Sequence, residues 1–447
     1  MQLTVLGGGG FRVPMVYRAL LSDDSDSRVH ELVLYDVDPA RLRRVSEVLA
    51  RLDARAGVPG PRVRLETDLT DAVRGADFVF SAIRVGGLEG RVCDERAALS
   101  EGVLGQETTG AGGICYGLRT VPVAMKIAHT VKKHAPDAYV INFTNPAGMV
   151  TEAMSRVLGD RVIGICDSPV GMFKRVARAL GVDRSRAAFD YAGLNHLGWL
   201  RRVMVDGVDV LPGLLADSEK LLTIEEGRLF GPSWLQSMGV VPNEYLWYWY
   251  YTKDAIASIE AARETRGEFL LSQQSGFYAG GGAAGDAYDS WDRTRREREE
   301  TYMADSRETS GGGERDEDDL DGDGYDQVAL DLMHAIARNK QQTLVLNVRN
   351  GYTLAGLDPD AVIEVPCIVD SNGPRALALD PLPPHAASLV ATVKDVERTT
   401  IEASMTGSRQ LAVRALALHP LVDSVTTARR IFERQLQELP DLARVFD

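Results

Sequence analysis

The sequence has few cysteines and no long apolar run, and each absence excludes a class of protein. Its 447 residues include only four cysteines, none in a C-x-x-C pair, which argues against a disulfide framework and a structural zinc site. No apolar run approaches the roughly 18 residues that a membrane span needs. The N-terminal residues begin a strand pattern at once, without the basic and apolar regions of a signal peptide. We therefore expect a cytoplasmic protein without a membrane-spanning segment.

The sequence also lacks an excess of basic residues and is poor in aromatic ones. Its 50 Lys and Arg stand against 64 Asp and Glu, so the formal net charge is −14. That charge repels nucleic acid and anionic lipid, and no long basic run opposes it. We therefore expect neither as a partner. Because aromatic residues make up only 7% of the chain, the run at 242–251 (PNEYLWYWYY) stands out, either as a core segment or as a wall that faces a sugar.

Short apolar runs alternate with longer amphipathic segments over the first 165 residues. This alternation is typical of a parallel α/β sheet covered by helices on both faces. After residue 165 it loosens into longer helical stretches mixed with strand candidates at 343–348 and 361–367. We therefore predict a Rossmann-type doubly wound parallel sheet over residues 1–165 and a second, mixed α/β domain over residues 166–447. The strands predicted for the first domain are Leu3–Leu6, Glu31–Tyr35, Phe78–Ile83, Tyr139–Phe143 and Val162–Ile165.

The segment 279–323 differs in kind from the rest of the chain. It carries three glycines at 280–282, a charged run at 293–300 and an acidic tail, with few apolar side chains. Such a composition buries too little apolar surface to offset the entropy lost on ordering. We interpret the segment as a mobile acidic insertion at the surface.

The first predicted strand leads directly into a glycine cluster that precedes a predicted helix. A dinucleotide-binding fold needs glycines there, because backbone N–H groups must approach a pyrophosphate at a helix N-terminus. The second strand ends at Asp36, where an acidic side chain binds a ribose hydroxyl and repels an added 2′-phosphate. We therefore predict an NAD site that comprises Gly7, Gly8, Gly9, Gly10, Phe11 and Asp36.

Three further polar residues follow predicted strands. Asn145 precedes Pro146, where a turn asparagine and a ligand contact are both reasonable interpretations. Cys166 follows the strand that ends at residue 165, and His196 comes later in the chain. Taken alone, this pair is more typical of a core thiol and a hydrogen-bonded histidine, because its spacing matches no metal-ligand motif.

Taken in order, the motifs of this sequence resemble those of family 4 glycoside hydrolases, most closely the 6-phospho-β-glucosidases. The most specific are G-Q-E-T-x-G at 105–110 and N-F-T-N-P-A-G at 142–148, and weaker matches cover nearly all of the chain outside the acidic insertion. The resemblance implies a fold similar to lactate and malate dehydrogenases, a tightly bound NAD and a divalent metal, usually Mn²⁺. It also implies a phosphorylated glycoside as ligand and a homodimer or homotetramer.

The resemblance further implies a redox-neutral hydrolysis, unlike the mechanism that uses paired carboxylates. Hydride leaves C3 of the sugar for NAD, a tyrosine removes the C2 proton, the C1 substituent is eliminated, water adds, and the hydride returns. By this resemblance Cys166 and His196 are the metal ligands. Tyr245 is the base, and Glu107 polarises that tyrosine.

The resemblance also assigns substrate contacts. Arg91 and Arg266 correspond to arginines that clamp the 6-phosphate, and Asn145 to an asparagine that contacts the substrate. Asp167 stands where β-specific members commonly have asparagine, and as a general acid it would fit the α-specific form, so a 6-phospho-α-glucosidase is the alternative within the family. A 2-hydroxy-acid dehydrogenase is less well supported, because Val170 occupies the arginine position of an Asp-x-x-Arg pair. A sugar-phosphate-binding protein without turnover is the third alternative.

Overall fold

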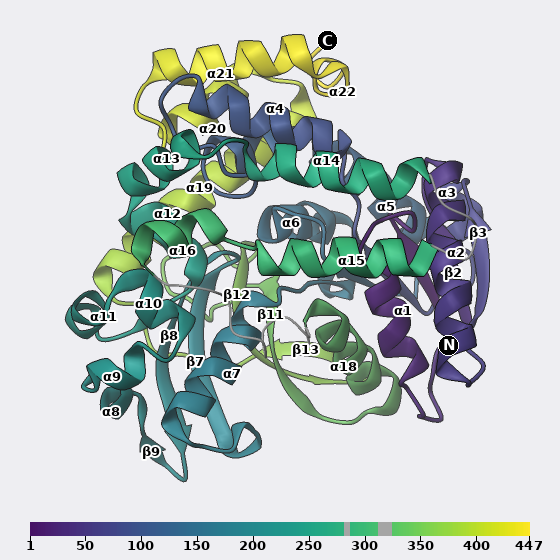
Figure 1. Cartoon of the computed structure of the whole chain (residues 1–447), viewed down its shortest axis with the longest axis horizontal. Coiled ribbons are helices and arrows are strands. Elements are labelled where there is room, and N and C mark those ends of the chain that lie inside the picture. Colours follow the sequence, from purple (N-terminus) through teal and green to yellow (C-terminus); the bar gives the residue numbers. More distant parts are fainter. Residues whose placement is uncertain (281–286, 312–323) are drawn as a thin grey trace.

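The computed structural model describes residues 1–280, 287–311 and 324–447, and within these ranges thirteen strands form one mixed sheet (Figure 1). The hydrogen-bonded order is β10-β8-β7-β12-β11-β6-β5-β4-β1-β2-β3, with β13 beside β12 and β9 beside β8. The strands are β1 (Gln2–Leu6), β2 (Glu31–Tyr35), β3 (Arg62–Glu66), β4 (Phe78–Ser81), β5 (Tyr139–Asn142), β6 (Val162–Gly164), β7 (Ala187–Leu194), β8 (Leu197–Val205), β9 (Val208–Asp209), β10 (Val241–Pro242), β11 (Gln342–Arg349), β12 (Val362–Asp370) and β13 (Gly373–Ala376).

The N-terminal half of the sheet is parallel and has the order of a dinucleotide-binding fold. Strands β3-β2-β1-β4-β5-β6 pair in parallel throughout, which confirms the doubly wound α/β prediction. β3 was not predicted, because its sequence R-V-R-L-E alternates charged and apolar residues, as a polar edge strand does. The helices of this half are α1 (Val13–Leu21), α2 (Pro39–Ala56), α3 (Leu69–Val73), α4 (Gly87–Leu99), α5 (Ala111–His134), α6 (Ala147–Leu158) and α7 (Ser168–Leu180).

The C-terminal half continues the same sheet with antiparallel strands. β11 joins the two halves by pairing Asn347 with Gly164 of β6, and β12, β7, β8 and β10 follow outward. The sheet thus changes from parallel to antiparallel pairing at the end of β6, and no break in it separates residues 1–165 from 166–447. The helices that follow β9 are α8 (Leu211–Leu215), α9 (Ser218–Leu221), α10 (Glu225–Phe230), α11 (Pro232–Met238), α12 (Trp247–Tyr250) and α13 (Thr252–Ala261).

The described part of the predicted acidic insertion is helical. α14 (Arg266–Ala279) and α15 (Ala287–Glu300) run side by side across the molecule, and α16 (Ala304–Ser310) follows (Figure 1). α15 buries Ala287, Trp291, Thr294 and Arg295, which recur at the spacing of one helix face. α15 therefore differs from the surface loop that its charge suggested, because one buried face that includes Trp291 packs it against the molecule. Residues 281–286 and 312–323 of the insertion lie outside the described residues.

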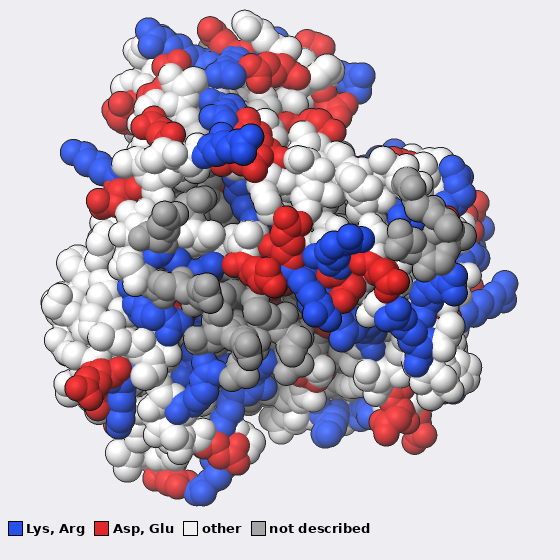
Figure 2. Space-filling view, in the orientation of Figure 1, with Lys and Arg blue, Asp and Glu red and all other residues white. Residues whose placement is uncertain are grey.

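The helices of the chain's C-terminal region pack on helices of the N-terminal half. α18 (Tyr325–Arg338) packs on α1, and α19 (Pro384–Thr406), α20 (Arg409–Leu418), α21 (Val425–Glu438) and α22 (Pro440–Ala443) lie over α4 and α5. No helix within the described ranges is long and apolar enough to cross a bilayer. Basic and acidic side chains are interspersed over the face that Figure 2 shows.

Candidate active site

A cavity of about 1060 Å³ lies where the parallel strands end, and most of the predicted site residues line it. This position follows from the topology, because the carboxyl ends of parallel strands meet at one edge of a doubly wound sheet. The glycine turn after β1 forms one side of the cavity. The turn of the β7–β8 hairpin, the Glu244–Leu246 turn and the ends of α14 and α15 contribute the others.

The glycine turn is held against β2 by its own backbone. The N–H groups of Gly7 and Gly8 both donate to the carbonyl of Tyr35, at 2.9 and 2.7 Å. A Cβ at Gly8 would lie 2.7 Å from Leu34 Cβ, and Gly7 has a φ of +84°, so neither position accepts a larger residue. Gly7 and Gly10 line the cavity, whereas Gly8 packs on β2.

Asp36 completes the predicted cofactor edge. Its carboxylate accepts hydrogen bonds from the backbone N–H groups of Gly9 and Asp38, both at 3.0 Å. Burial raises the pKa of Asp36, although these two donors oppose that shift. A Cβ at Gly9 would come within 3.0 Å of this carboxylate, which explains the glycine. Asp36 also lines the cavity, as the predicted ribose-binding role requires.

Phe11 lies at the cavity edge and also docks α15. Its ring packs edge-on against Phe277 and beside Trp291, and its backbone carbonyl accepts a 2.9 Å hydrogen bond from Trp291 Nε1. The end of the glycine turn is thereby tied to a helix almost three hundred positions later in the chain. Tyr278 of α14 adds a second tie, since its hydroxyl donates to the carbonyl of Gly9 at 2.7 Å.

Cys166 and His196 line the same cavity from separate elements. Cys166 lies between β6 and α7, and His196 is the second residue of the two-residue turn that joins β7 and β8. His196 has a φ of +61°, the left-handed conformation that such turns need. Its Nδ1 is hydrogen-bonded to Thr108 Oγ1 at 3.0 Å, which orients the ring and leaves Nε2 as the nitrogen that could ligate a metal. Burial lowers the pKa of His196 to about 4, so the imidazole is neutral.

Asn145 adds an unsatisfied oxygen to the same wall. It lines the cavity beside the cis peptide bond to Pro146, and its buried Oδ1 has no hydrogen-bond partner among the described residues. A buried polar atom without a partner is costly unless a ligand or ion satisfies it. Within the described ranges no group of three or more His, Cys, Asp and Glu side chains is arranged to hold a metal, so Cys166 and His196 would supply two protein ligands.

Tyr245 is the predicted base, and its ring lies flat against that of His196. The centroids are 3.6 Å apart and the planes 2° from parallel. The Asn243 side chain accepts the Tyr245 N–H at 3.0 Å and thereby caps the Glu244–Leu246 turn. The hydroxyl of Tyr302 donates to Tyr245 Oη at 3.0 Å. Burial raises the pKa of Tyr245 well above its ordinary value and the Tyr302 hydrogen bond lowers it, so the phenol needs nearby positive charge to act as a base.

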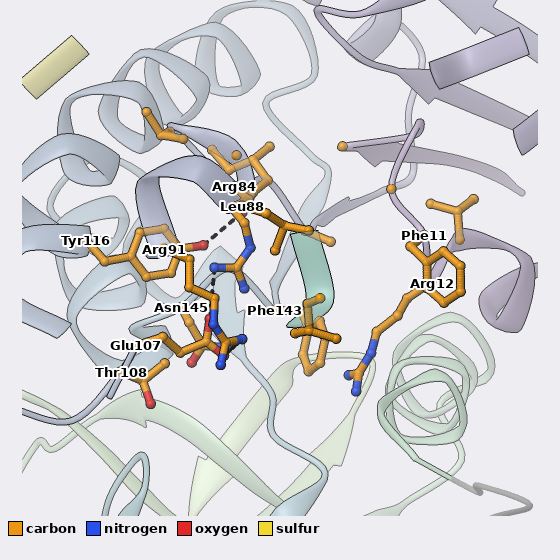
Figure 3. A pocket seen from close by; sticks show the side chains of 18 of the residues that line it. Phe11, Arg12, Arg84, Leu88, Arg91, Glu107, Thr108, Tyr116, Phe143 and Asn145 are labelled. Carbon is orange, nitrogen blue, oxygen red and sulfur yellow. Dashed lines mark hydrogen bonds and ion pairs between the residues drawn. The ribbon is translucent and has the colours of Figure 1, made fainter. Parts of the chain in front are cut away.

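Glu107 is ionised and held between two arginines, as Figure 3 shows. Arg84 and Arg91 each place an Nη1 atom 2.8 Å from one of its oxygens, and Arg91 Nε also donates to Glu95 at 2.7 Å. Burial alone would raise the pKa of Glu107, but the two guanidinium groups lower it to about 2. The Glu107 carboxylate also acts electrostatically on Tyr245, whose pKa it raises.

The other predicted residues lie at the edges of the site. Asp167 lines the cavity with a partly exposed side chain, 4.0 Å from Arg12 Nη1. Arg266 does not line the large cavity. It lines a smaller one of about 80 Å³, which shares Arg91, Glu107 and Tyr245 with the first.

Several cavity residues were not singled out from the sequence. Thr108 belongs to the motif at 105–110, but nothing in that motif distinguishes an orienting threonine, and no pattern around Arg84 indicates a counter-ion. Arg298 and Tyr302 lie in the segment interpreted as a mobile insertion. The recurrence of Ala287 and Trp291 at i and i+4, followed by residues at i+7 and i+8, is the signal that could have indicated a packed helix there.

Comparison with known proteins agrees with this arrangement. The family model described as "Family 4 glycosyl hydrolase" matches residues 2–182. The model described as "Family 4 glycosyl hydrolase C-terminal domain" matches residues 191–422. A probable 6-phospho-β-glucosidase of Bacillus subtilis is 32% identical over 98% of this chain and 96% of its own length. The chain belongs to glycosyl hydrolase family 4. The predicted family resemblance is therefore confirmed.

Other members of family 4 are similar over the whole chain. A maltose-6′-phosphate glucosidase of B. subtilis is 31% identical over 97% of this chain and 94% of its own length. The 6-phospho-β-glucosidase of Thermotoga maritima, solved with manganese, NAD⁺ and glucose 6-phosphate, has a TM-score of 0.80 at 28% identity and covers 98% of both chains. Malate dehydrogenase of Plasmodium falciparum, with a TM-score of 0.50 at 13% identity over 91% of this chain and 99% of its own, shares the fold alone.

Proposed function

We propose that this family 4 chain hydrolyses 6-phospho-β-glucosides and uses NAD and a divalent cation such as Mn²⁺. One observation carries the proposal: the glycine turn with Asp36, the Cys166–His196 pair and Tyr245 all line one cavity. The Thermotoga relative was solved with manganese, NAD⁺ and glucose 6-phosphate, and this supports a site for a cofactor, a cation and a sugar phosphate in one cavity. When bound, NAD supplies hydride-transfer chemistry and the cation polarises sugar oxygens as a Lewis acid.

The residues present fit a dinucleotide. Gly7 and Gly8 leave no room for side chains at the turn, and α1 begins immediately after it, so its N-terminus faces the position of a pyrophosphate. The partly buried Asp36 carboxylate would accept a ribose hydroxyl and disfavour a 2′-phosphate in its place.

The residues present also fit a divalent cation. Cys166 would offer a thiolate and His196 its Nε2, and the partnerless Oδ1 of Asn145 would offer an oxygen to the cation or to the sugar. Burial and the carboxylates of Glu364 and Asp167 raise the pKa of the Cys166 thiol well above its ordinary range. A bound cation would therefore have to ionise this thiol, and metal affinity would rise with pH.

The chain's own groups then act on the sugar. We propose that Tyr245 Oη takes the proton from C2, with its ring held by His196 and its hydroxyl by Tyr302. Glu107 keeps Arg84 and Arg91 in place and tunes Tyr245 electrostatically. Asp167, partly exposed at the cavity wall, would donate a proton to the departing oxygen.

A 6-phospho-α-glucosidase is the second candidate, and Asp167 favours it. The sequence Cys166-Asp167-Ser168-Pro169 has the α-type aspartate, and the maltose-6′-phosphate glucosidase of B. subtilis is nearly as similar as the probable β-enzyme. The family resemblance also leads us to propose a cytoplasmic homodimer or homotetramer.

The deciding experiment compares the p-nitrophenyl 6-phosphoglucosides of both anomers, with NAD, Mn²⁺ and a reductant. We expect hydrolysis of the β anomer that depends on added NAD but releases no net NADH. Hydrolysis of the α anomer alone would replace the proposal by the second candidate. Turnover of neither anomer would contradict both, and stoichiometric NADH from a simple hydroxy acid would indicate a dehydrogenase.

A further inference from the structure

Gln106 lies in the loop before α5, and its side chain folds back on that loop. Its side-chain oxygen Oε1 accepts hydrogen bonds from the backbone N–H groups of Thr108 and Thr109, both at 2.6 Å. These two donors fix the orientation of the amide, because its NH₂ group could not face them. Thr108 Oγ1 also lies 3.1 Å from the same Oε1. Three groups of the loop therefore meet on one oxygen atom.

The loop that carries Gln106 and Thr108 packs directly on the first turn of α5. A Cβ at Gly112 would collide with the backbone carbonyl oxygen of Gln106, and a Cβ at Gly113 with that of Thr108. Only glycine allows two backbone segments to approach so closely. Backbone packing and the Gln106 amide therefore both hold the Thr108 hydroxyl in place.

The contacts of the Thr108 hydroxyl determine the direction in which it donates. Gln106 Oε1 can only accept, so a hydroxyl oxygen 3.1 Å away must place its hydrogen between the two oxygens, since their lone pairs would otherwise repel. That is the only hydrogen of the hydroxyl, so Oγ1 accepts at its 3.0 Å contact with His196 Nδ1. The hydrogen of the neutral imidazole therefore lies on Nδ1, and Nε2 keeps its lone pair.

A metal ligand requires this tautomer of histidine. A cation binds the lone pair of an imidazole nitrogen, so a hydrogen on Nε2 would block that nitrogen. Ligating histidines generally donate their other N–H group to a polar partner, which fixes the tautomer and the ring orientation. The Tyr245 ring stacks on His196 with the centroids 3.6 Å apart, which fixes the plane of the imidazole but not the position of its hydrogen. Thr108 and Gln106 supply that second constraint.

We propose that Gln106 is a positioning residue that selects the metal-binding tautomer of His196 through the Thr108 hydroxyl. His196 Nδ1–H donates to Thr108 Oγ1, and the Thr108 hydroxyl donates to Gln106 Oε1. The inference rests on the proposed function, because it takes His196 as a ligand of the divalent cation. It gives the glutamine of the G-Q-E-T-x-G motif a role at the metal site without direct contact with the metal.

The experiment follows the tautomer and the metal separately, in the full chain loaded with NAD. Before Mn²⁺ is added, ¹⁵N NMR of the histidine-labelled chain shows which ring nitrogen of His196 carries hydrogen, and the spectrum of H196Q identifies its signals. The Kd of Mn²⁺ is then measured by electron paramagnetic resonance, and the Kd of NAD by fluorescence.

The variants separate the hydrogen-bond relay from the stability of the loop. Q106M keeps the length of the side chain but removes the acceptor, whereas Q106E retains acceptor oxygens. T108V removes the hydroxyl and T108S keeps it, and Q106M/T108V combines the two losses. The control is Q236M, which changes an exposed glutamine that donates to Ser218.

We expect the wild type, Q106E, T108S and Q236M to carry the His196 hydrogen on Nδ1. Q106M and T108V should populate the form with hydrogen on Nε2 and bind Mn²⁺ about 10- to 100-fold more weakly, as loss of the partner of a ligating histidine predicts. The Kd of NAD should not change. Because Gln106 acts through Thr108, Q106M/T108V should bind Mn²⁺ no more weakly than T108V alone.

Four results would overturn the inference. Hydrogen on Nε2 of His196 in the wild type would reverse the relay. An unchanged tautomer and an unchanged Mn²⁺ Kd in Q106M would show that Gln106 does not act on His196. Additive losses in Q106M/T108V, with equally weakened NAD binding, would mean that Gln106 only supports the loop. A wild type that binds no Mn²⁺ would remove the metal site itself.

Failure of the proposed function looks different from failure of this inference. The wild type would then hydrolyse no phosphoglucoside, whereas its Mn²⁺ Kd and its His196 tautomer would still respond to Q106M.

Discussion

The cavity is built from two regions that position their residues in different ways. On one side the glycine turn and the strand ends are fixed by backbone hydrogen bonds, such as those from Gly7 and Gly8 to Tyr35. On the other side α14 to α16 hold their residues through side chains: Trp291 on Phe11, Tyr302 on Tyr245 and Arg266 on the end of α15. The glycine turn and the strand ends suit a cofactor that many enzymes share. The helical side is where the substrate specificity and the pKa of the base can vary.

The largest effect is expected on the strand-end side, from C166S. Replacing the thiol removes one of two candidate metal ligands, and loss of several kcal/mol of Lewis-acid stabilisation corresponds to about 1000-fold in kcat. NAD affinity, measured by fluorescence titration, should stay near the wild-type value because the glycine turn is untouched. The control C93S changes a thiol that donates to Glu438 instead. Full activity of C166S would exclude Cys166 from the metal site.

The next effect is expected where the two regions meet, from E107Q. The variant keeps the size of the side chain but leaves the half-buried Arg84 and the buried Arg91 without their shared carboxylate. We expect kcat to fall about 10- to 100-fold, because removing one partner of a buried charge pair is costly. E47Q, at an exposed pair with Arg44, is the matched control. Equal kcat values for E107Q and E47Q would contradict this role of Glu107.

A smaller effect is expected on the helical side, from Y302F. The lost hydroxyl donates to Tyr245 and lowers its pKa, so removing it should raise that pKa. The rising limb of the kcat profile should therefore move to higher pH, and kcat near pH 7 should fall roughly 3- to 10-fold. Y288F, also in this segment, serves as the control. A lower kcat with an unshifted profile would show that Tyr302 does not tune the base.

The smallest effect is expected from W291F, which tests how α15 is docked. Phenylalanine removes the hydrogen bond to the carbonyl of Phe11 and some buried volume. We expect a loss of about 2 kcal/mol in the free energy of unfolding, with kcat nearly unchanged. W234F, at an exposed tryptophan, is the control in the same denaturant titration. If W291F were no less stable than W234F, α15 would not depend on this contact.

The strands and the cofactor edge could be predicted because their signals are local. An apolar run, a glycine turn and an acid at a strand end each report a backbone requirement that a short window contains. The predicted strands ending at Leu6 and Tyr35 end where β1 and β2 do. The proposed metal ligands were not predictable from spacing, because Cys166 and His196 come from separate elements of the fold and line one cavity only through the sheet topology. Only the family resemblance assigned them together.

The helical side could not be predicted because its stabilising contacts are long-range. α15 is mostly charged, and its burial depends on Phe11, which lies at the other end of the chain. Charge density therefore suggested a mobile loop where the fold has a docked helix. The same long-range packing brings Arg298 and Tyr302 to the cavity. The helical spacing from Ala287 could indicate a packed helix, but not which distant residues that helix meets.

Deuterium incorporation during turnover tests the proposed roles of Tyr245 and NAD most directly. In D₂O, a base that removes the C2 proton and later returns one exchanged with solvent leaves deuterium on that carbon. We predict that glucose 6-phosphate released from the phosphorylated β-glucoside carries deuterium at C2, as NMR would detect. Product released at a normal rate with only hydrogen at C2 would contradict the role of Tyr245 and the redox-neutral route.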